Sequence, residues 1–198
     1  MYKYASEINE ENIIIQKLYD DNVYLIKDFV CGNDYIDEFL KKKAIYSRES
    51  TTHLILEKSS NLLLGFFSLS ASGISFNMSE VNTLREKKNR FNISAVEIDF
   101  FAVNKPFQHM FYDEISEKEK EEYFLSDILF EKIMEFILNL RESIGFRSVV
   151  LYSVPNSKDS NKPLNIYERF NFVSFKDYME QDRKRYLEGC IPLFKDVD

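Results

Sequence analysis

The sequence predicts a mixed α/β (α+β) fold, with a central sheet of about six to seven strands flanked by helices, in a single domain over residues 1–198. Runs of β-branched and aromatic residues alternate with segments whose apolar residues recur at helical spacing, and this order is typical of a sheet covered by helices. The 198 residues suit one domain. An apolar fraction of 44% is large enough to form a core, which excludes a disordered chain.

The first half of the chain is expected to form a strand, a helix and an antiparallel hairpin. Residues 13–18 are rich in β-branched side chains and predict a strand. Asn33 and Asp34 are helix-capping residues, and the apolar residues after them recur at helical spacing to about Ser47. Two strand-like runs over 51–57 and 62–70, joined by a polar turn over 58–61, predict the hairpin.

The second half is expected to complete the sheet and to add two helices. Residues 79–92 are polar and are expected to be helical for a turn or two, and Ala95–Val103 is the clearest strand in the chain. An acidic loop insertion follows, around 106–124. The apolar stripe of residues 126–143 then predicts a long helix, with Gly145 as its terminator. The last expected elements are a buried strand over 148–154, a short helix over 163–170, and strands over 172–175 and 191–194.

Charge and cysteine content narrow the class of protein. The 26 Lys and Arg against 33 Asp and Glu give a net charge of −7, which argues against a strongly basic nucleic-acid-binding protein. Two cysteines, Cys31 and Cys190, cannot form a disulfide framework, and together with only two histidines they give no basis for a metal site. No apolar run is long enough to cross a bilayer, and the N-terminus lacks an apolar leader, so we expect a cytoplasmic protein without a membrane partner.

Three segments, in order along the chain, carry a resemblance to a known family. Residues 29–40 read Phe-Val-Cys-Gly-Asn-Asp-Tyr-Ile-Asp-Glu-Phe-Leu, residues 97–103 read Glu-Ile-Asp-Phe-Phe-Ala-Val and are followed by Phe107-Gln108, and residues 164–172 read Leu-Asn-Ile-Tyr-Glu-Arg-Phe-Asn-Phe. Together they resemble acyl-CoA-dependent N-acetyltransferases of the GNAT superfamily, nearest to the toxins of toxin–antitoxin pairs. The resemblance implies a GNAT-like sheet and acetyl-CoA as the co-substrate.

The resemblance also implies where the coenzyme is held. The residues implied as coenzyme contacts are Phe101, Ala102, Val103, Gln108, Leu125, Ser126, Asp127 and Asn165. The main chain of the first three would hold the pantetheine arm and the thioester oxygen. The pyrophosphate loop departs from the family pattern, because no glycine lies between Gly73 and Gly145, and glycines let main-chain N–H groups reach a phosphate. A carboxylate at Asp127 beside a pyrophosphate would be unfavourable unless it points away.

Acetyl transfer to an amine needs a base, because an alkylamine with a pKa of about 10.4 is almost entirely protonated at neutral pH. Strand alternation places Glu97, Asp99, Phe101 and Val103 on one face and leaves an apolar face opposite. Glu97 matches the family's strand-four base and is expected to accept the amine's proton directly or through water. Asp99 is an alternate base or a contact for the acceptor's ammonium group. By resemblance, Tyr167 is the general acid that protonates the leaving thiolate.

The sequence leaves two functional readings open. The first is an N-acetyltransferase that moves an acetyl group from acetyl-CoA to a primary amine by direct attack in a ternary complex. Its acceptor is a small molecule, a protein or, as in the toxin branch, an aminoacyl-tRNA, for which residues 41–43 with Arg48 and residues 85–90 are the available basic clusters. The second is a catalytically impaired GNAT-fold binding or regulatory module, which the missing glycines favour. A homodimer and an antitoxin partner are left open.

Overall fold

The computed structural model describes residues 8–77, 90–111, 124–154, 162–174 and 190–197, with only the backbone described for 75–77, 90, 91 and 162–165. Its helical elements are η2 (Glu10–Asn12), η3 (Val23–Ile26), α1 (Asp34–Glu38), η4 (Phe39–Lys43), η5 (Ala44–Tyr46), η6 (Lys105–Phe107), α3 (Leu125–Arg141) and α4 (Lys162–Arg169). Its strands are β1 (Ile13–Lys17), β2 (Ser50–Glu57), β3 (Leu62–Asn77), β4 (Arg90–Val103), β5 (Ser148–Ser153), β6 (Val173–Ser174) and β7 (Ile191–Asp196).

The strands form one seven-stranded sheet in the order β1-β2-β3-β4-β5-β7-β6. The β4–β5 pair is parallel, whereas the pairs β1–β2, β2–β3, β5–β7 and β6–β7 are antiparallel. The sheet is therefore mixed, as predicted from the sequence, and the predicted hairpin is the β2–β3 pair. The hairpin turn is held by Glu57, whose carboxylate accepts hydrogen bonds from the main chain of Ser59 and Ser60.

The chain divides into two compact units. Unit 1 comprises Met1–Ser70 and Asp99–Asn139, and unit 2 comprises Ala71–Ile98 and Leu140–Asp198. The long strands β3 and β4 contribute residues to both units.

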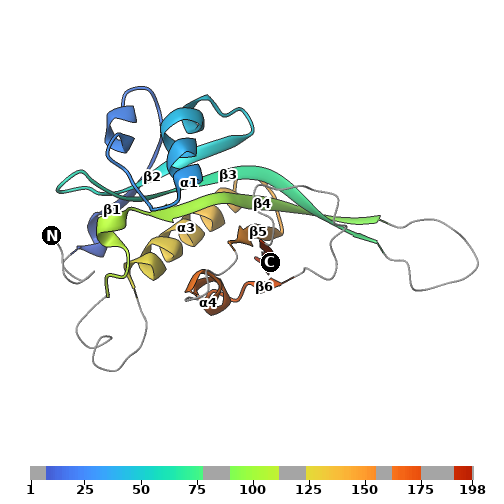
Figure 1. The fold of residues 1–198 in the computed structure, drawn as a ribbon. Coiled ribbons are helices and arrows are strands. Elements are labelled where there is room, and N and C mark those ends of the chain that lie inside the picture. The colour runs from blue at the N-terminus through green and yellow to red at the C-terminus, as the bar shows by residue number, and fades with distance from the viewer. Residues whose placement is uncertain (1–7, 78–89, 112–123, 155–161, 175–189, 198) are drawn as a thin grey trace, which may run out of the picture. The chain divides into compact units, whose positions relative to one another are not determined.

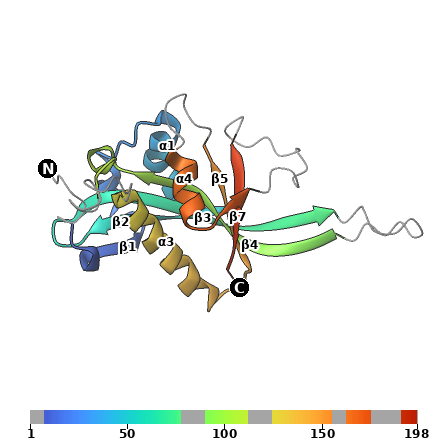
Figure 2. The ribbon, with the colours of Figure 1, turned by 90° about the horizontal axis from the view of Figure 1, so that it is seen from below.

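In unit 1, helices cover both faces of the strands. Figure 1 shows α1 on one side of β2 and β3, and Figure 2 shows α3 crossing the opposite side. On the α1 side, Phe29, Phe39, Leu40, Phe66 and Ala102 belong to one buried cluster. On the α3 side the buried residues of the helix follow helical spacing: Leu125, Ile128, Leu129, Ile133 and Ile137.

The segment before α1 folds locally because of its capping residues. Gly32 has a φ of +89°, which a glycine adopts without steric cost. Asn33 then caps α1, since its side chain accepts hydrogen bonds from the N–H groups of Tyr35 and Ile36. Asp37 reaches back and accepts a hydrogen bond from the Cys31 N–H at 2.8 Å. The predicted helix over 33–47 is confirmed, although it changes from α to a π turn at Phe39 and to a 3₁₀ turn at Ala44.

Unit 2 is built on the parallel strand β5. Its side chains alternate, and Val150 packs with Ile74 and Ala95 in a second buried cluster, against which Tyr152 and Phe194 also pack. Pro192 faces Tyr152 in the antiparallel β5–β7 ladder.

One predicted element differs from the structure, and two fall outside the described residues. Residues 90–92, expected at the end of a short helix, are the first residues of β4 instead. In the sequence, polar and apolar residues alternate over 90–92 as they do in the strand that follows. The polar composition of the segment made this two-residue period easy to overlook. The remainder of that helix, residues 79–89, and the acidic run over 113–122 lie outside the described residues. The other predicted strands and helices are confirmed with boundaries shifted by a few residues, except that β3 extends well past Ser70.

Candidate functional site

Strand β4 parts from β5 before it ends. The parallel register runs from Ala95↔Ser148 to Ile98↔Leu151, whereas β4 continues to Val103. From Asp99 onward, the edge of β4 that faced β5 has no partner among the strands that the structure describes. Main-chain N–H and C=O groups at such an edge are available to an extended ligand, which would add to the sheet as a strand does.

The side chains of β4 do not alternate strictly at this point. Asp99 accepts a hydrogen bond from the Ser70 hydroxyl at 3.0 Å, and Ser70 lies on the same face of β3 as Phe66, which is the α1 face. Phe100 also lies on the α1 face, because its ring stacks on Phe39 with a centroid distance of 4.0 Å. Two successive side chains on one face indicate a local irregularity of the bulge type.

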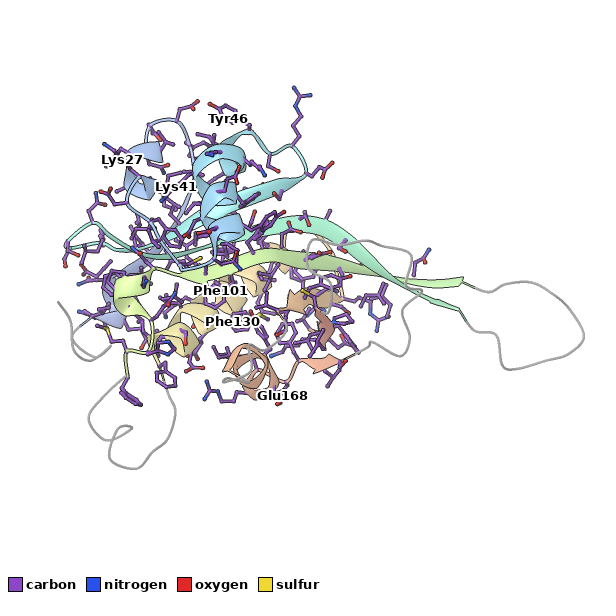
Figure 3. The ribbon with its side chains drawn as sticks, in the orientation of Figure 1. Lys27, Lys41, Tyr46, Phe101, Phe130 and Glu168 are labelled. Carbon is purple, nitrogen blue, oxygen red and sulfur yellow. The ribbon has the colours of Figure 1, made fainter. Side chains whose placement is uncertain are left out.

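The prediction that Asp99 and Phe101 share a face is therefore wrong. Phe101 packs on the opposite side, against Phe130 of α3, with a centroid distance of 5.5 Å (Figure 3). Ala102, predicted on the same face as Phe100, does lie with it in the α1-side cluster. The bulge is invisible to a period-two pattern, since it adds one residue to one side only.

Glu97 lies on β4 in unit 2 and is 2% exposed. The Ser72 hydroxyl donates a hydrogen bond to its Oε2 at 2.9 Å. Ser70 and Ser72 both lie on the neighbouring strand β3. Each donates a hydrogen bond from its hydroxyl to one of the two carboxylates of β4. Neither serine was singled out from the sequence, although the alternation Ser68, Ser70, Ser72 along β3 is a signal that would have marked a polar stripe.

The pKa of Asp99 is raised by its surroundings. Burial raises its pKa from 3.8 to about 6, against the hydrogen bond from Ser70, which lowers it, while the negative charge of Glu49 raises it further. Its Oδ2 atom is buried and has no hydrogen-bond partner among the residues that the structure describes. A carboxyl group with a pKa near neutrality is suited to accepting and releasing a proton.

Tyr167 is held in place by the end of its own helix. Asn171 has a φ of +60°, its N–H donates to the Glu168 carbonyl at 3.0 Å, and the Phe172 N–H donates to the Tyr167 carbonyl at 3.0 Å. This is the Schellman pattern, in which Asn171 takes the left-handed position that glycine usually occupies. The pattern includes a hydrophobic contact, and here the rings of Phe172 and Tyr167 meet edge to face at 6.2 Å.

The same helix end explains why residues 164–172 depart from the family pattern at one position. Asn171 replaces the family's glycine, and asparagine is among the few residues that adopt positive φ at low cost. Burial raises the pKa of Tyr167 to about 12, so its phenol is protonated at neutral pH. Asn165 lies on α4, but its side chain is outside the described residues.

Gln108 has an internal role. Its side-chain amide donates to the Val103 carbonyl at 2.9 Å and to the Cys31 carbonyl at 2.8 Å. It therefore joins the end of β4 to the segment before α1. Asn104 supports the same corner, since its N–H donates to the Leu64 carbonyl at 2.8 Å and its side chain donates to the Leu63 carbonyl at 3.0 Å.

The start of α3 is closed by the chain itself. The carboxylate of Asp127 accepts a hydrogen bond from the Phe124 N–H at 2.7 Å, and Asp127 is fully buried. The Leu125 N–H donates to the Met110 carbonyl at 2.8 Å, and the Asp127 N–H donates to the Phe124 carbonyl at 2.9 Å. Ser126 is half-buried in the same turn. Two of the N–H groups in the first turn of α3, those of Leu125 and Asp127, are thus engaged within the chain.

Cys31 and His53 do not form a reactive pair. Burial and the neighbouring Asp37 raise the pKa of the Cys31 thiol to about 12, which keeps it protonated. His53 is buried and stacks on Phe67 at a centroid distance of 5.0 Å. Burial, together with the positive charge of Lys17, lowers the pKa of His53 to about 4. His53 lies on the face of β2 that α3 covers, where its ring also contacts Phe136. The residue type alone does not indicate that position.

The described residues also bear on metal sites and membrane spans. Within the ranges that the structure describes, no group of three or more His, Cys, Asp and Glu side chains is arranged to hold a metal ion. Of the helices described, none has the length and apolar character to span a bilayer.

Comparison with known proteins identifies the fold. No protein-family model matches the chain, and no curated protein matches its sequence. Solved structures match it over nearly its full length, among them KacT and the toxin AtaT. The chain therefore has the fold of these proteins, and the mixed α/β fold expected from the sequence is confirmed.

Three of these structures give the scale of the similarity. A tyrosine-to-phenylalanine variant of KacT is 17% identical, with 93% of this chain and 95% of that chain covered and a TM-score of 0.61. AtaTR bound with AcCoA is 15% identical, with 94% of each chain covered and a TM-score of 0.63. AtaT complexed with acetyl-methionyl-tRNAfMet is 15% identical, with 93% and 94% covered and a TM-score of 0.57.

Proposed function

We propose that this protein is an N-acetyltransferase that moves an acetyl group from acetyl-CoA to a primary amine by direct attack in a ternary complex. The observation that carries the proposal is the edge of β4 from Asp99 to Val103, which lacks a partner strand among the described residues, on a strand whose two carboxylates, Glu97 and Asp99, are held by serines. The fold supports the proposal, because AtaTR, which has the same fold, was solved with AcCoA bound. We further propose that residues 1–198 form one domain, because β3 and β4 run through both units.

The thioester is proposed to lie along the β4 edge. Main-chain groups of Phe101, Ala102 and Val103 would hold the pantetheine arm, and an N–H among them would stabilise the oxyanion that forms on the thioester carbonyl. Gln108 supports this edge through its bond to the Val103 carbonyl. Ser126 and Asn165 are the side chains proposed to reach the coenzyme from α3 and α4. This half of the site fits a pantetheine thioester, whereas the start of α3 does not fit a diphosphate.

Glu97 is proposed to take the proton from the attacking amine. A nitrogen–carbon bond forms while the carbon–sulfur bond breaks, and the amine must lose a proton in the process. Because Glu97 is almost fully buried, its proton exchange would pass through the Ser72 hydroxyl or a water molecule. Asp99, two residues further along β4, is the alternate base, and its pKa of about 6 suits that role.

Tyr167 is proposed to stabilise the leaving thiolate. Thiols have an ordinary pKa of about 8.5, so a phenol with a pKa of about 12 transfers its proton to a thiolate uphill by roughly 5 kcal/mol. Tyr167 would therefore stabilise the thiolate chiefly by donating a hydrogen bond, and the thiol proton would be completed as the product leaves. Losing that hydroxyl should lower kcat and leave KM for the thioester nearly unchanged.

The acceptor and the partners are also matters of proposal. The toxin-type reading makes the acceptor an aminoacyl-tRNA, supported by AtaT complexed with acetyl-methionyl-tRNAfMet, and makes an antitoxin a partner, supported by AtaT bound to the C-terminus of AtaR. The net charge of −7 favours a small or protein-borne amine instead. A phosphate-rich acceptor should give activity that falls steeply with salt, whereas a small amine should not. We propose a cytoplasmic location.

The test is thiol release from acetyl-CoA in the presence of amine acceptors, with the acetylated product identified by mass. The native protein should release thiol only when an acceptor is present. Tyr167→Phe should lower kcat about 10²–10³-fold, and Glu97→Gln should shift the rising limb of the pH–rate profile. Unchanged kinetics in both variants would remove these residues from the mechanism.

One observation favours a second function, the impaired binding module. The occupied start of α3 reduces the number of donors for the coenzyme's diphosphate. A module without a donor site should show no thermal shift at millimolar acetyl-CoA or acetyl-pantetheine, whereas a ligand at 100 times its Kd adds about 2.7 kcal/mol.

A further inference from the structure

The last residues of β4 direct their main-chain groups to two opposite edges. In an extended strand the N–H and C=O groups of one residue point to the same edge, and those of the next residue point to the other. The Asn104 N–H donates to the Leu64 carbonyl at 2.8 Å, so Asn104 faces β3. The Ala102 carbonyl also faces β3, because a Cβ on Gly65 of that strand would lie 2.7 Å from its oxygen. The main-chain groups of Val103 therefore face the opposite edge, beyond the end of the β4–β5 pairing.

Gln108 occupies part of that edge. Its side-chain Nε2 donates to the Val103 carbonyl at 2.9 Å and to the Cys31 carbonyl at 2.8 Å. A strand added at this edge would donate to the same Val103 carbonyl from one of its own N–H groups. The Gln108 amide thus takes the place of one donor of an added strand. The Val103 N–H lies on the same edge and is not used by Gln108.

Two hydrogen bonds fix the peptide plane that follows Val103. Its carbonyl is held by Gln108 on one edge, and its N–H, which belongs to Asn104, is held by the Leu64 carbonyl on the other. Successive peptide planes share a Cα atom, so a plane held on both edges limits the rotation of the one before it, which carries the Val103 N–H. Gln108 therefore sets the direction of a main-chain donor that it does not touch.

From this geometry we infer that Gln108 is a positioning residue for the acyl donor: its amide caps the edge of β4 at the Val103 carbonyl and directs the Val103 N–H at a carbonyl oxygen of the donor. The inference rests on the proposed acetyltransferase function, and it assigns Gln108 a role through Val103 in place of direct contact with the coenzyme. By the same alternation the main chain of Phe101 faces the donor and that of Ala102 faces β3. At Val103 the donor must present an acceptor atom, because the Val103 carbonyl is already bound.

The experiment measures acetyl-CoA binding by calorimetry, together with unfolding in urea, on the native protein and three variants. Gln108→Met keeps the length of the side chain and removes both donors. It should weaken acetyl-CoA binding about tenfold, the effect of one misdirected hydrogen bond. Gln16→Met makes the same change at an exposed position of β1 and should leave the Kd unchanged.

Gln108→Glu, the third variant, gives a readout that a merely structural role would not move. Its carboxylate cannot donate and is repelled by both carbonyls, whereas its protonated form can donate to the Val103 carbonyl. The two carbonyls should raise the carboxyl pKa above its ordinary value of about 4.3. Relative to the native protein, acetyl-CoA binding by Gln108→Glu should therefore strengthen about tenfold from pH 7.5 to pH 5, while the relative binding by Gln108→Met should not change.

The outcomes separate this inference from the proposed function. A Kd of Gln108→Met within about threefold of the native value, whatever the change in stability, would overturn the positioning role and leave the acetyltransferase intact. Equal relative binding by Gln108→Glu at both pH values would overturn it as well.

If neither Gln108 variant folds, NMR of the native protein decides. Acetyl-CoA should shift the Val103 amide signal, while the side-chain amide protons of Gln108 stay protected from exchange with solvent. An unchanged Val103 signal, or loss of that protection, would contradict the inference. If the native protein binds no acetyl-CoA, the proposed function is wrong, and this inference with it.

Discussion

Asp99 should make the stability of the protein depend on pH in a way that one substitution removes. In the folded chain, burial holds its pKa at about 6 instead of the ordinary 3.8. Below the ordinary pKa the carboxyl group is protonated in both the folded and the unfolded state and costs nothing. As pH rises toward 6, only the unfolded state releases the proton, so the free energy of unfolding falls, and above pH 6 the loss is complete.

The size of the effect follows from the shift in the Asp99 pKa. One pKa unit corresponds to about 1.36 kcal/mol, so a rise from 3.8 to about 6 has an upper limit of about 3 kcal/mol. Because Asp99 is partly exposed, we expect about 1–2 kcal/mol. Asp99→Asn does not titrate and keeps an oxygen for the Ser70 hydroxyl. Relative to the native protein it should therefore gain about 1–2 kcal/mol between pH 4.5 and pH 7.5.

The assay is urea unfolding followed by circular dichroism across that pH range, with the slope m checked for constancy. Glu49→Gln removes a charge that raises the Asp99 pKa, and it should move the midpoint of the pH dependence to lower pH. Glu135→Gln, an exposed carboxylate in an ion pair with Lys132, serves as the control. Parallel stability curves for the native protein and Asp99→Asn would refute the assignment of a perturbed carboxyl group to this position.

Three further predictions concern local geometry. Gly65→Ala should destabilise the protein by about 1–3 kcal/mol in urea unfolding, because its Cβ would lie 2.7 Å from the Ala102 carbonyl oxygen, whereas Gly145→Ala, with nothing within 4 Å, should have little effect. Asn171→Ala should lower the thermal midpoint by the equivalent of about 1 kcal/mol while Asn171→Gly holds or raises it; equal effects would contradict the left-handed helix end. Cys31, with a pKa of about 12, should react with iodoacetamide at pH 8 far more slowly than the same thiol in the urea-unfolded chain; equal rates would exclude its protection by the fold.

The order of the elements was predictable because each strand and helix carries its own periodicity. The apolar stripe of α3 and the β-branched run of β1 are local signals, and both gave the observed element. The extension of β3 and the early start of β4 were missed, because a polar strand beyond a core has no hydrophobic pattern to mark it. The pairing of the long strands is set by tertiary contacts.

The candidate site was predictable only as residue identities. The motif around Tyr167 pointed to the residue, but the helix end that fixes its ring depends on Asn171 adopting positive φ, a property of conformation. The serine hydrogen bonds to Glu97 and Asp99, and the bulge beside them, depend on contacts between segments that are distant in sequence. The hydrogen bond from the Phe124 N–H to Asp127 depends on the direction of the Asp127 side chain. Composition records none of these.

A crystal structure with a non-hydrolysable acetyl-pantetheine analogue tests the central proposal most directly. We predict that the analogue extends along β4 beyond Ile98, with the oxygen that replaces the thioester carbonyl accepting a hydrogen bond from a main-chain N–H between Phe101 and Val103. An analogue seated elsewhere, or a β5 strand that pairs with β4 through to Val103 and leaves the edge filled, would contradict it.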